Sequence, residues 1–145
     1  MIFSDILSLS TVFLYIIPVT LYGITHKSYH KKAFIGVLAT LMISECLKHI
    51  FIKDVSPRPH GALNCDLMCM NGNQAGKPGM PSSHSAVVTF FALFYYRHIT
   101  NPFLRTTIIL YAISIMISRY DKKCHTIPQI IMGGLLGLSM NIVIK

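Results

Sequence analysis

Two histidines, two arginines and a pair of serines stand at the ends of apolar segments of this chain. Their order is Arg58-Pro59, then Pro81-Ser82-Ser83-His84, then Ser118-Arg119, and finally His125. Ionisable groups at the edge of a membrane are costly, so their presence there indicates a functional site. Imidazole groups beside guanidinium groups indicate one chemistry first, the transfer of a phosphoryl group.

Each of these residues also has a purely structural explanation when it is taken alone. Ser82 after a proline is typical of a helix N-cap, and an arginine at a helix end can reach lipid headgroups. In combination the residues predict a phosphate site. Arg58 and Arg119 would hold phosphate oxygens by forked hydrogen bonds. The Ser82 hydroxyl and the Ser83 amide would donate to a further oxygen at a helix start, where unpaired N–H groups favour anions.

The two histidines would carry the reaction itself. His84 falls in the first turn of an apolar helix, where it can donate a proton to a departing oxygen. His125 also stands at a helix start, and an unprotonated imidazole there can attack phosphorus. The pair predicts an acid and a nucleophile.

The composition is that of a membrane protein. Hydrophobic residues make up 52% of the 145 residues and charged residues only 12%, against about 25% in soluble domains. The formal net charge is +8, but the basic residues lie in short loops between apolar runs. They fit anionic headgroups or an anionic substrate. The absence of basic stripes interleaved with exposed aromatic residues argues against nucleic-acid binding.

Five apolar segments approach the length of about 20 residues that a membrane span requires. They cover residues 6–24, 33–52, 82–99, 103–118 and 126–144, and Pro18 is expected to kink the first. The glycines Gly133, Gly134 and Gly137 allow the last segment to pack closely on a neighbour. We therefore predict an all-α protein, a single polytopic bundle of about five transmembrane helices over residues 1–145.

Helix counting sorts the loops between the two membrane faces. The N-terminus, residues 53–80 and residues 119–125 share one face, which carries all the candidate site residues. Lysine and arginine residues outside the site are more numerous on the other face, which favours a luminal or external active face. We expect the endoplasmic reticulum or another internal, viral or plasma membrane.

The four cysteines of the chain bear on core packing, on a disulfide and on a metal site. Cys46 falls within an apolar segment and should pack in the core, whereas Cys65 and Cys69 lie in the long polar loop. An oxidising lumen on that side would allow a disulfide in this loop, but the sequence does not decide whether Cys65 and Cys69 pair. Their Cys-x3-Cys spacing is a weak zinc signal, because no second ligand pair follows at a finger-like distance. The sequence therefore predicts no metal site.

The order of these motifs resembles the type 2 phosphatidic acid phosphatase superfamily. That superfamily's pattern is Lys-x6-Arg-Pro, then Pro-Ser-Gly-His, then Ser-Arg-x5-His-x3-Asp. The stretches from Gly79 to Ser85 and from His125 to Gln129 are similar to a narrower branch, the dolichyl-diphosphatases. In that branch, too, Ser-Ser-His replaces Ser-Gly-His and a glutamine replaces the aspartate.

The resemblance implies roles for the residues. His125 would be the nucleophile that forms a phosphohistidine, and His84 would be the acid for the leaving group. The transferred phosphoryl group would be held by Arg58, Arg119, Ser82, the Ser83 amide and a lysine. Positioning and charge stabilisation would supply most of the catalysis, with neither a metal nor a cofactor.

Two departures from the superfamily pattern bear on the site. Gln129 stands where the pattern has aspartate, and a neutral amide can only orient the imidazole through its carbonyl oxygen. The lysine is displaced as well: Lys48 precedes Arg58 by ten positions and Lys53 by five. Lys48 lies in the better helical context but requires an insertion of three residues. Lys53 remains an alternative.

The leading interpretation is a phosphatase that converts a polyprenyl or dolichyl diphosphate to the monophosphate, with the lipid phosphate and membrane lipids as its partners. A second interpretation is a lipid phosphate monoesterase of the phosphatidic acid type. A third is an inactive membrane scaffold of the same fold, which Gln129 and the displaced lysine would support. A panel of lipid phosphates separates the three.

Overall fold

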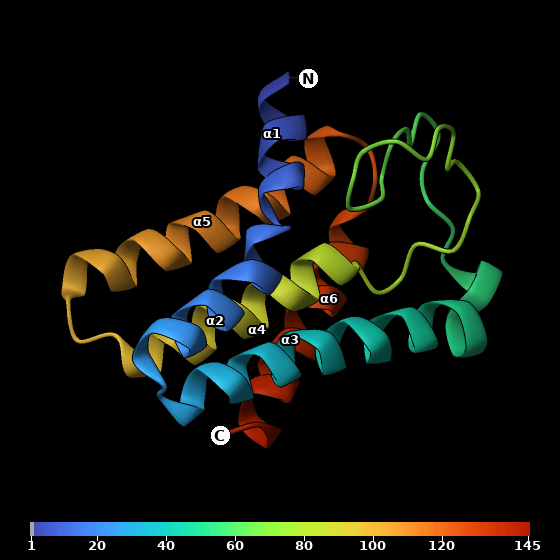
Figure 1. The fold of residues 1–145 in the computed structure, drawn as a ribbon. Coiled ribbons are helices and arrows are strands. Elements are labelled where there is room, and N and C mark those ends of the chain that lie inside the picture. Colours follow the sequence, from blue (N-terminus) through green and yellow to red (C-terminus); the bar gives the residue numbers. More distant parts are fainter. Residues whose placement is uncertain (1) are drawn as a thin grey trace.

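A computed structural model describes residues 2–145 as an all-helical bundle (Figure 1). The α-helices are α1 (Ile2–Ser10), α2 (Phe13–Thr25), α3 (Ser28–Cys46), α4 (Ser83–His98), α5 (Pro102–Asp121) and α6 (Ile127–Val143). A π-helical turn, η1 (Leu47–Ile52), and a 3-10 turn, η2 (Lys53–Val55), continue α3. The part of the chain described forms no strand, so the predicted all-α fold class is confirmed.

Helix α4 occupies the centre of the bundle and contacts α2, α3, α5 and α6 (Figure 1). Its apolar residues are buried on every side, and Val88, Phe90 and Phe94 are at most 1% exposed. A helix that is apolar all round belongs in the interior rather than at a surface. The helix that carries His84 is thus held by all its neighbours.

Two glycines of α6 bring that helix against α4. A Cβ atom at Gly133 would overlap the carbonyl oxygen of Ser82, and one at Gly137 would overlap that of Ala86. Glycine alone allows two backbones to approach so closely, as the sequence predicted for these positions. The approach places the start of α4, with His84, beside the start of α6, which His125 precedes.

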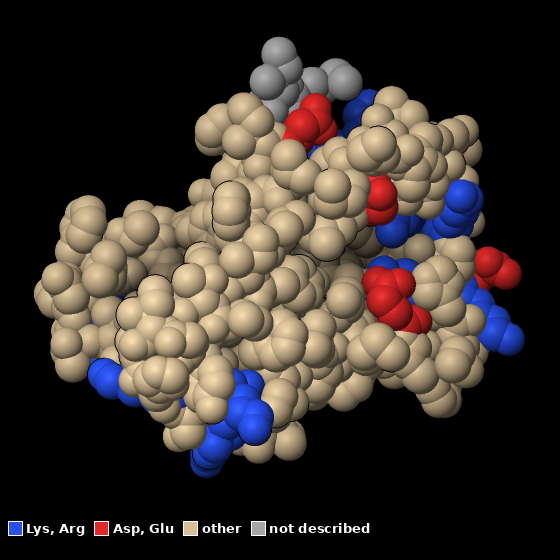
Figure 2. Space-filling model, viewed as in Figure 1, with Lys and Arg blue, Asp and Glu red and all other residues tan. Residues whose placement is uncertain are grey.

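The outer helices present apolar side chains to their surroundings. By length and hydropathy two helical stretches can cross a membrane, Ser28–Val55 and Pro102–Asp121. Helices α1 and α2 add a third span if the bent pair is one crossing, and α6 is a shorter apolar helix. Charged side chains gather at the two ends of the visible face and leave an uncharged band between them (Figure 2). These features describe a membrane-embedded protein.

The five predicted segments all form helices, but two details differ. The first segment breaks at Thr11–Val12, with a bend of 40°, whereas Pro18 lies inside α2. The prediction of a kink at Pro18 is therefore wrong, because the bend lies at Thr11–Val12. The central helix α4 has only 16 residues. Because other helices surround it, it needs neither the length nor the outer face of a lipid-exposed span.

Candidate active site

A cavity of about 360 Å³ opens at the end of the bundle where α3 ends and α4 begins. Residues 56–82 form a loop that folds back over this end (Figure 1). Five of the predicted site residues line the cavity: Lys48, Arg58, Ser83, His84 and His125. They come from four separate stretches of the chain, so the fold brings together the motifs that the sequence separates.

His125 lies against Gln129, one turn further along at the start of α6. The distance between Nδ1 of His125 and Oε1 of Gln129 is 3.3 Å. An amide oxygen can only accept, so Nδ1 carries the proton and Nε2 keeps its lone pair. The arrangement leaves the imidazole in the tautomer that a nucleophile requires.

The orientation of the Gln129 amide is fixed by the loop. Its Nε2 atom donates to the carbonyl oxygens of Ser56 (3.1 Å) and Pro57 (2.9 Å) and to the Ser56 hydroxyl. The backbone of Gly79 passes so close that a Cβ atom there would lie 2.7 to 2.9 Å from the amide. A carboxylate could not make the bonds to the two carbonyl groups. Glutamine therefore both orients His125 and ties the loop to α6.

The electrostatic surroundings keep His125 neutral. Burial lowers the pKa of His125 well below its ordinary value, and the positive charges of Arg58, Arg119 and Lys48 lower it further. The hydrogen bond to Gln129 raises the pKa, but this is the smallest of these influences. An imidazole with a low pKa remains unprotonated at neutral pH, as attack on phosphorus requires.

Two buried nitrogen atoms on residues that line the cavity have no protein partner. They are Nε2 of His84 and Nη1 of Arg58, both on cavity-lining residues. The Arg58 backbone is held by bonds from its N–H to Lys77 and from Gly76 to its carbonyl. Buried donors are nearly always paired in folded proteins. Their lack of a partner here indicates that a ligand with acceptor oxygens completes the site.

The two serines at the start of α4 play different parts. Ser82 is fully buried as the N-cap, and its hydroxyl accepts from the backbone and the side chain of Ser85. It does not line the cavity. Ser83 does line the cavity, and its hydroxyl bonds to the Lys48 ammonium at 2.6 Å.

Lys48 and Lys53 are placed very differently. The Lys48 side chain is buried beside the cavity, whereas the Lys53 side chain is exposed and does not line it. The π-helical turn η1 begins directly before Lys48 and is followed by the 3-10 turn η2. These two turns take up the additional residues between the lysine and Arg58. Single π turns inside helices are frequent at functional sites.

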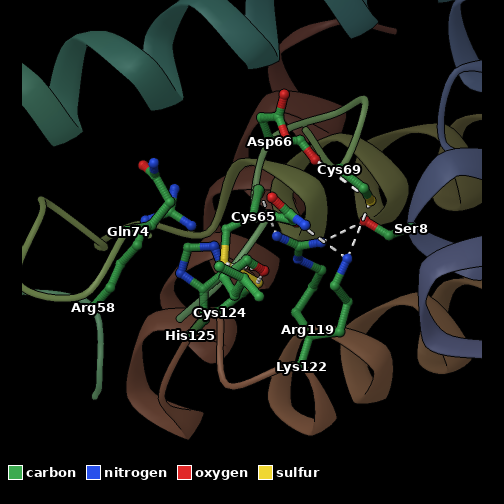
Figure 3. Close-up of a disulfide and its surroundings, with 12 residues drawn as sticks. Ser8, Arg58, Cys65, Asp66, Cys69, Gln74, Arg119, Lys122, Cys124 and His125 are labelled. Atoms are coloured by element: carbon green, nitrogen blue, oxygen red, sulfur yellow. Dashed lines mark hydrogen bonds between the residues drawn. A yellow bond between two sulfur atoms is a disulfide. The ribbon is translucent and has the colours of Figure 1, made fainter. Parts of the chain in front are cut away.

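Arg119 does not line the cavity in this structure. Its guanidinium is fully buried and donates from Nη1 to the Ser8 hydroxyl and from Nη2 to the Cys65 carbonyl, both at 2.5 Å. Figure 3 shows Arg119 and Arg58 on opposite sides of a disulfide. The carbonyl oxygen of Arg119 accepts from the N–H groups of Cys124 and His125. Arg119 therefore fixes the segment that carries His125.

That disulfide joins Cys65 to Cys124, so Cys65 and Cys69, whose pairing the sequence left open, do not pair. Cys69 is free and lies 3.1 Å from the Lys122 ammonium, which also pairs with Asp5. Cys65 and Cys69 both lie in the long loop, but the fold brings Cys65 onto the segment before His125. Cys46 is exposed rather than packed in the core.

Three comparisons with known proteins bear on the site. A sequence profile of the PAP2 superfamily matches residues 30–145, which covers every cavity-lining residue predicted from the sequence. Searches of curated proteins and of solved structures gave no significant match. The matched stretch begins in α3 and excludes α1 and α2, so Ser8 lies outside it.

Proposed function

This chain belongs to the PAP2 superfamily, whose members are generally phosphatases, and from that premise we propose that it hydrolyses a polyprenyl or dolichyl diphosphate to the monophosphate. The observation that carries the proposal is the set of unpartnered buried donors at the cavity. Two such atoms, Nη1 of Arg58 and Nε2 of His84, belong to predicted site residues that line the cavity. Phosphate oxygens are acceptors that suit these donors.

The first step is the formation of a phosphohistidine. Nε2 of His125 attacks the terminal phosphorus, the bond from phosphorus to the bridging oxygen breaks, and His84 donates a proton to that oxygen. The lipid monophosphate leaves. Arg58 and Lys48 meet the negative charge on the phosphoryl oxygens, which is the main contribution that a protein makes to such a transfer.

The second step returns the enzyme to its starting state. A water molecule attacks the phosphohistidine, His84 accepts a proton from it, and the bond between Nε2 and phosphorus breaks. Inorganic phosphate leaves, and His125 is again neutral. Gln129 keeps the Nδ1 proton in place through both steps, because its oxygen has no proton to exchange.

A lipid substrate fits the surroundings of the cavity. Tyr15, Leu41 and Val87 line it together with the polar residues, and they come from α2, α3 and α4. An isoprenoid chain can leave the polar end along these apolar side chains. The disulfide lies at the same end, which supports an active face toward an oxidising lumen or the exterior.

The test is a substrate panel with purified protein in detergent and excess chelator. We expect phosphate release from dolichyl or farnesyl diphosphate and at least 1,000-fold lower kcat/KM in His125→Ala, since removal of a nucleophile abolishes the covalent route. Acid-labile phosphate should appear on the wild-type protein and not on the variant. Turnover that survives both His125→Ala and His84→Ala would overturn the mechanism.

The same panel separates the other two interpretations. Preference for phosphatidic acid over the diphosphates would identify a monoesterase. A folded protein that neither hydrolyses any lipid phosphate nor binds orthovanadate would identify an inactive scaffold.

A further inference from the structure

Lys48, Ser83 and Glu45 form a hydrogen-bonded group at the wall of the cavity. The Lys48 ammonium lies 2.6 Å from Oε1 of Glu45 and 2.6 Å from the Ser83 hydroxyl. Ser83 and Glu45 are themselves bonded at 2.5 Å, and the Ser44 hydroxyl lies 2.7 Å from that of Ser83. All but Ser44 line the cavity.

The direction of each bond follows from what the groups can donate. An ammonium only donates and a carboxylate only accepts, so Lys48 donates to both partners and the Ser83 proton goes to Glu45. Ser83 then accepts from Lys48 and from Ser44 with its two lone pairs. Every donor and acceptor of the Ser83 hydroxyl is used, so its position is fully determined.

This arrangement leaves the ammonium with one free N–H. Two of its three donors are held by Glu45 and Ser83, and tetrahedral geometry then restricts the direction of the third. A lysine side chain is otherwise a flexible point charge with considerable rotamer entropy. Fixing it before the substrate arrives lowers the cost of ordering it in the transition state.

Glu45 also offsets the burial of the Lys48 charge. Lys48 is 3% exposed, while the Glu45 side chain is 41% exposed and its other oxygen lies 3.2 Å from Nε2 of His49. A buried ammonium is costly unless a partner compensates it. The carboxylate that compensates this charge is itself partly exposed to solvent.

We propose that Glu45 is a positioning residue that acts through Lys48, with the Ser83 hydroxyl as the second point of attachment. The proposal rests on the proposed function, because it assigns the lysine that meets the phosphoryl charge. It also gives a physical reason for the serine at position 83, where the superfamily pattern has a glycine. A glycine could not hold the ammonium at its displaced position.

The test is a double-mutant cycle on kcat and KM. We expect Lys48→Met to lower kcat/KM about 100-fold, as for loss of one charge-stabilising donor. Glu45→Ala should lower it about 10-fold, mainly through kcat, since the charge remains but its position is lost. The double variant should match Lys48→Met within about twofold, because residues that act as one unit are not additive. Glu45→Gln keeps an accepting oxygen and should recover most of the activity.

Asp54→Ala is the matched control, because Asp54 is an exposed carboxylate in η2 that does not line the cavity. It should retain wild-type kinetics. Full activity in Glu45→Ala, or effects of Glu45→Ala and Lys48→Met that multiply in the double variant, would overturn the proposal. Should Glu45→Ala not fold, Ser83→Gly takes its place in the cycle with the same expected pattern.

The failure of the proposed function is distinguishable from the failure of this inference. If the wild-type protein hydrolyses no lipid phosphate, the proposed function is wrong, and the same cycle is then measured on the dissociation constant for orthovanadate. Non-additive weakening of orthovanadate binding would still support positioning through Lys48. Unchanged binding in Glu45→Ala would overturn it.

Discussion

The site has two cationic regions that are built in opposite ways. Arg58, His84 and Lys48 line the cavity. Nη1 of Arg58 and Nε2 of His84 have no protein partner, and the Lys48 ammonium has bonds for only two of its three N–H groups. In the corner between α1, α5 and the disulfide, both terminal nitrogens of Arg119 are already bonded to the protein. We call the side of the cavity with Arg58, His84 and Lys48 the open wall, because its hydrogen-bonding groups remain available to a substrate. We call the surroundings of Arg119 the closed corner, because its terminal nitrogens bond to the protein itself.

The difference shows how stability and chemistry are divided within one small site. A buried donor without a partner costs about 1 to 3 kcal/mol, so an open wall weakens the fold that carries it. The closed corner offsets this cost with a disulfide and charged hydrogen bonds. It also holds the backbone of His125 through the Arg119 carbonyl. Variants in the two regions should therefore separate stability from catalysis.

The largest effect is expected from Arg119→Met. The substitution removes two hydrogen bonds from a charged donor, each worth about 1.5 to 3 kcal/mol, and leaves the Cys65 carbonyl and Ser8 without a donor. The free energy of unfolding in detergent should fall by about 3 to 6 kcal/mol, and activity should fall with it. Arg105→Met is the matched control at the other end of α5, where the guanidinium makes one hydrogen bond, to the Ile99 carbonyl, and lies 5.0 Å from the centre of the Tyr96 ring. Equal destabilisation in both variants would contradict the hypothesis that the contacts of Arg119 stabilise the closed corner.

The second largest effect is expected from removal of the disulfide. Cys65 and Cys124 are 59 positions apart, and closing a loop of that length constrains the unfolded chain by about 4 kcal/mol. The variant Cys65→Ala/Cys124→Ala should lose stability of that order, measured by chemical unfolding. Any protein that remains folded should keep a measurable kcat, because neither sulfur atom belongs to the proposed chemistry.

Cys46→Ala controls for the loss of a cysteine as such, because Cys46 is free and exposed. It should leave stability unchanged. A double cysteine variant as stable as Cys46→Ala would show that the corner does not depend on the disulfide.

Arg58→Met probes the open wall. Its Nε atom makes one long bond, 3.4 Å, to the Pro78 carbonyl, and Nη1 makes none. Removing the guanidinium should lower kcat/KM about 100- to 1,000-fold, equivalent to about 3 to 4 kcal/mol of transition-state stabilisation. Stability should change by less than about 1 kcal/mol. Steady-state kinetics and thermal unfolding on the same preparation separate the two effects. A large loss of stability would mean that Arg58, like Arg119, mainly holds the fold together.

Sequence alone predicted the helices, because membrane spans need long apolar runs that can be recognised without tertiary contacts. The glycines at positions 133 and 137 were also predictable, since close helix packing leaves few alternatives to glycine. The grouping of Arg58, His84 and His125 followed from helix counting. The roles assigned to these residues stay predictions until they are measured.

The contacts between distant segments were out of reach of the sequence. Nothing in the local pattern shows that Cys65 pairs with Cys124, because the partner is chosen by how the loop folds back. The break at Thr11–Val12 was missed for a similar reason: proline marks a lost hydrogen bond, but packing decides where a helix bends. The π-helical turn beside Lys48 also depends on tertiary packing.

The smallest effect is expected on the pH dependence of kcat/KM in Arg58→Met. It tests whether the charge of Arg58 in the open wall acts on the proposed nucleophile His125. Burial, followed by the charges of Arg58, Arg119 and Lys48, lowers the pKa of His125 well below its ordinary value. Only the neutral imidazole attacks, so the acid limb of the kcat/KM profile of the wild-type enzyme should lie well below pH 6.5, where His125 gains a proton. In Arg58→Met one of these charges is absent, and the acid limb should move to higher pH.

The stability of the fold should follow the same group. Because the folded pKa of His125 lies below its unfolded value, the unfolded chain binds more protons between the two. Stability is therefore present above pH 6.5 and is lost as the pH falls toward the folded pKa. Arg58→Met should narrow the pH range over which this stability is lost, because the folded pKa of His125 moves closer to its unfolded value. An acid limb at the same pH in both proteins would mean that Arg58 does not act on His125 through its charge, and the open wall would then be a set of independent donors.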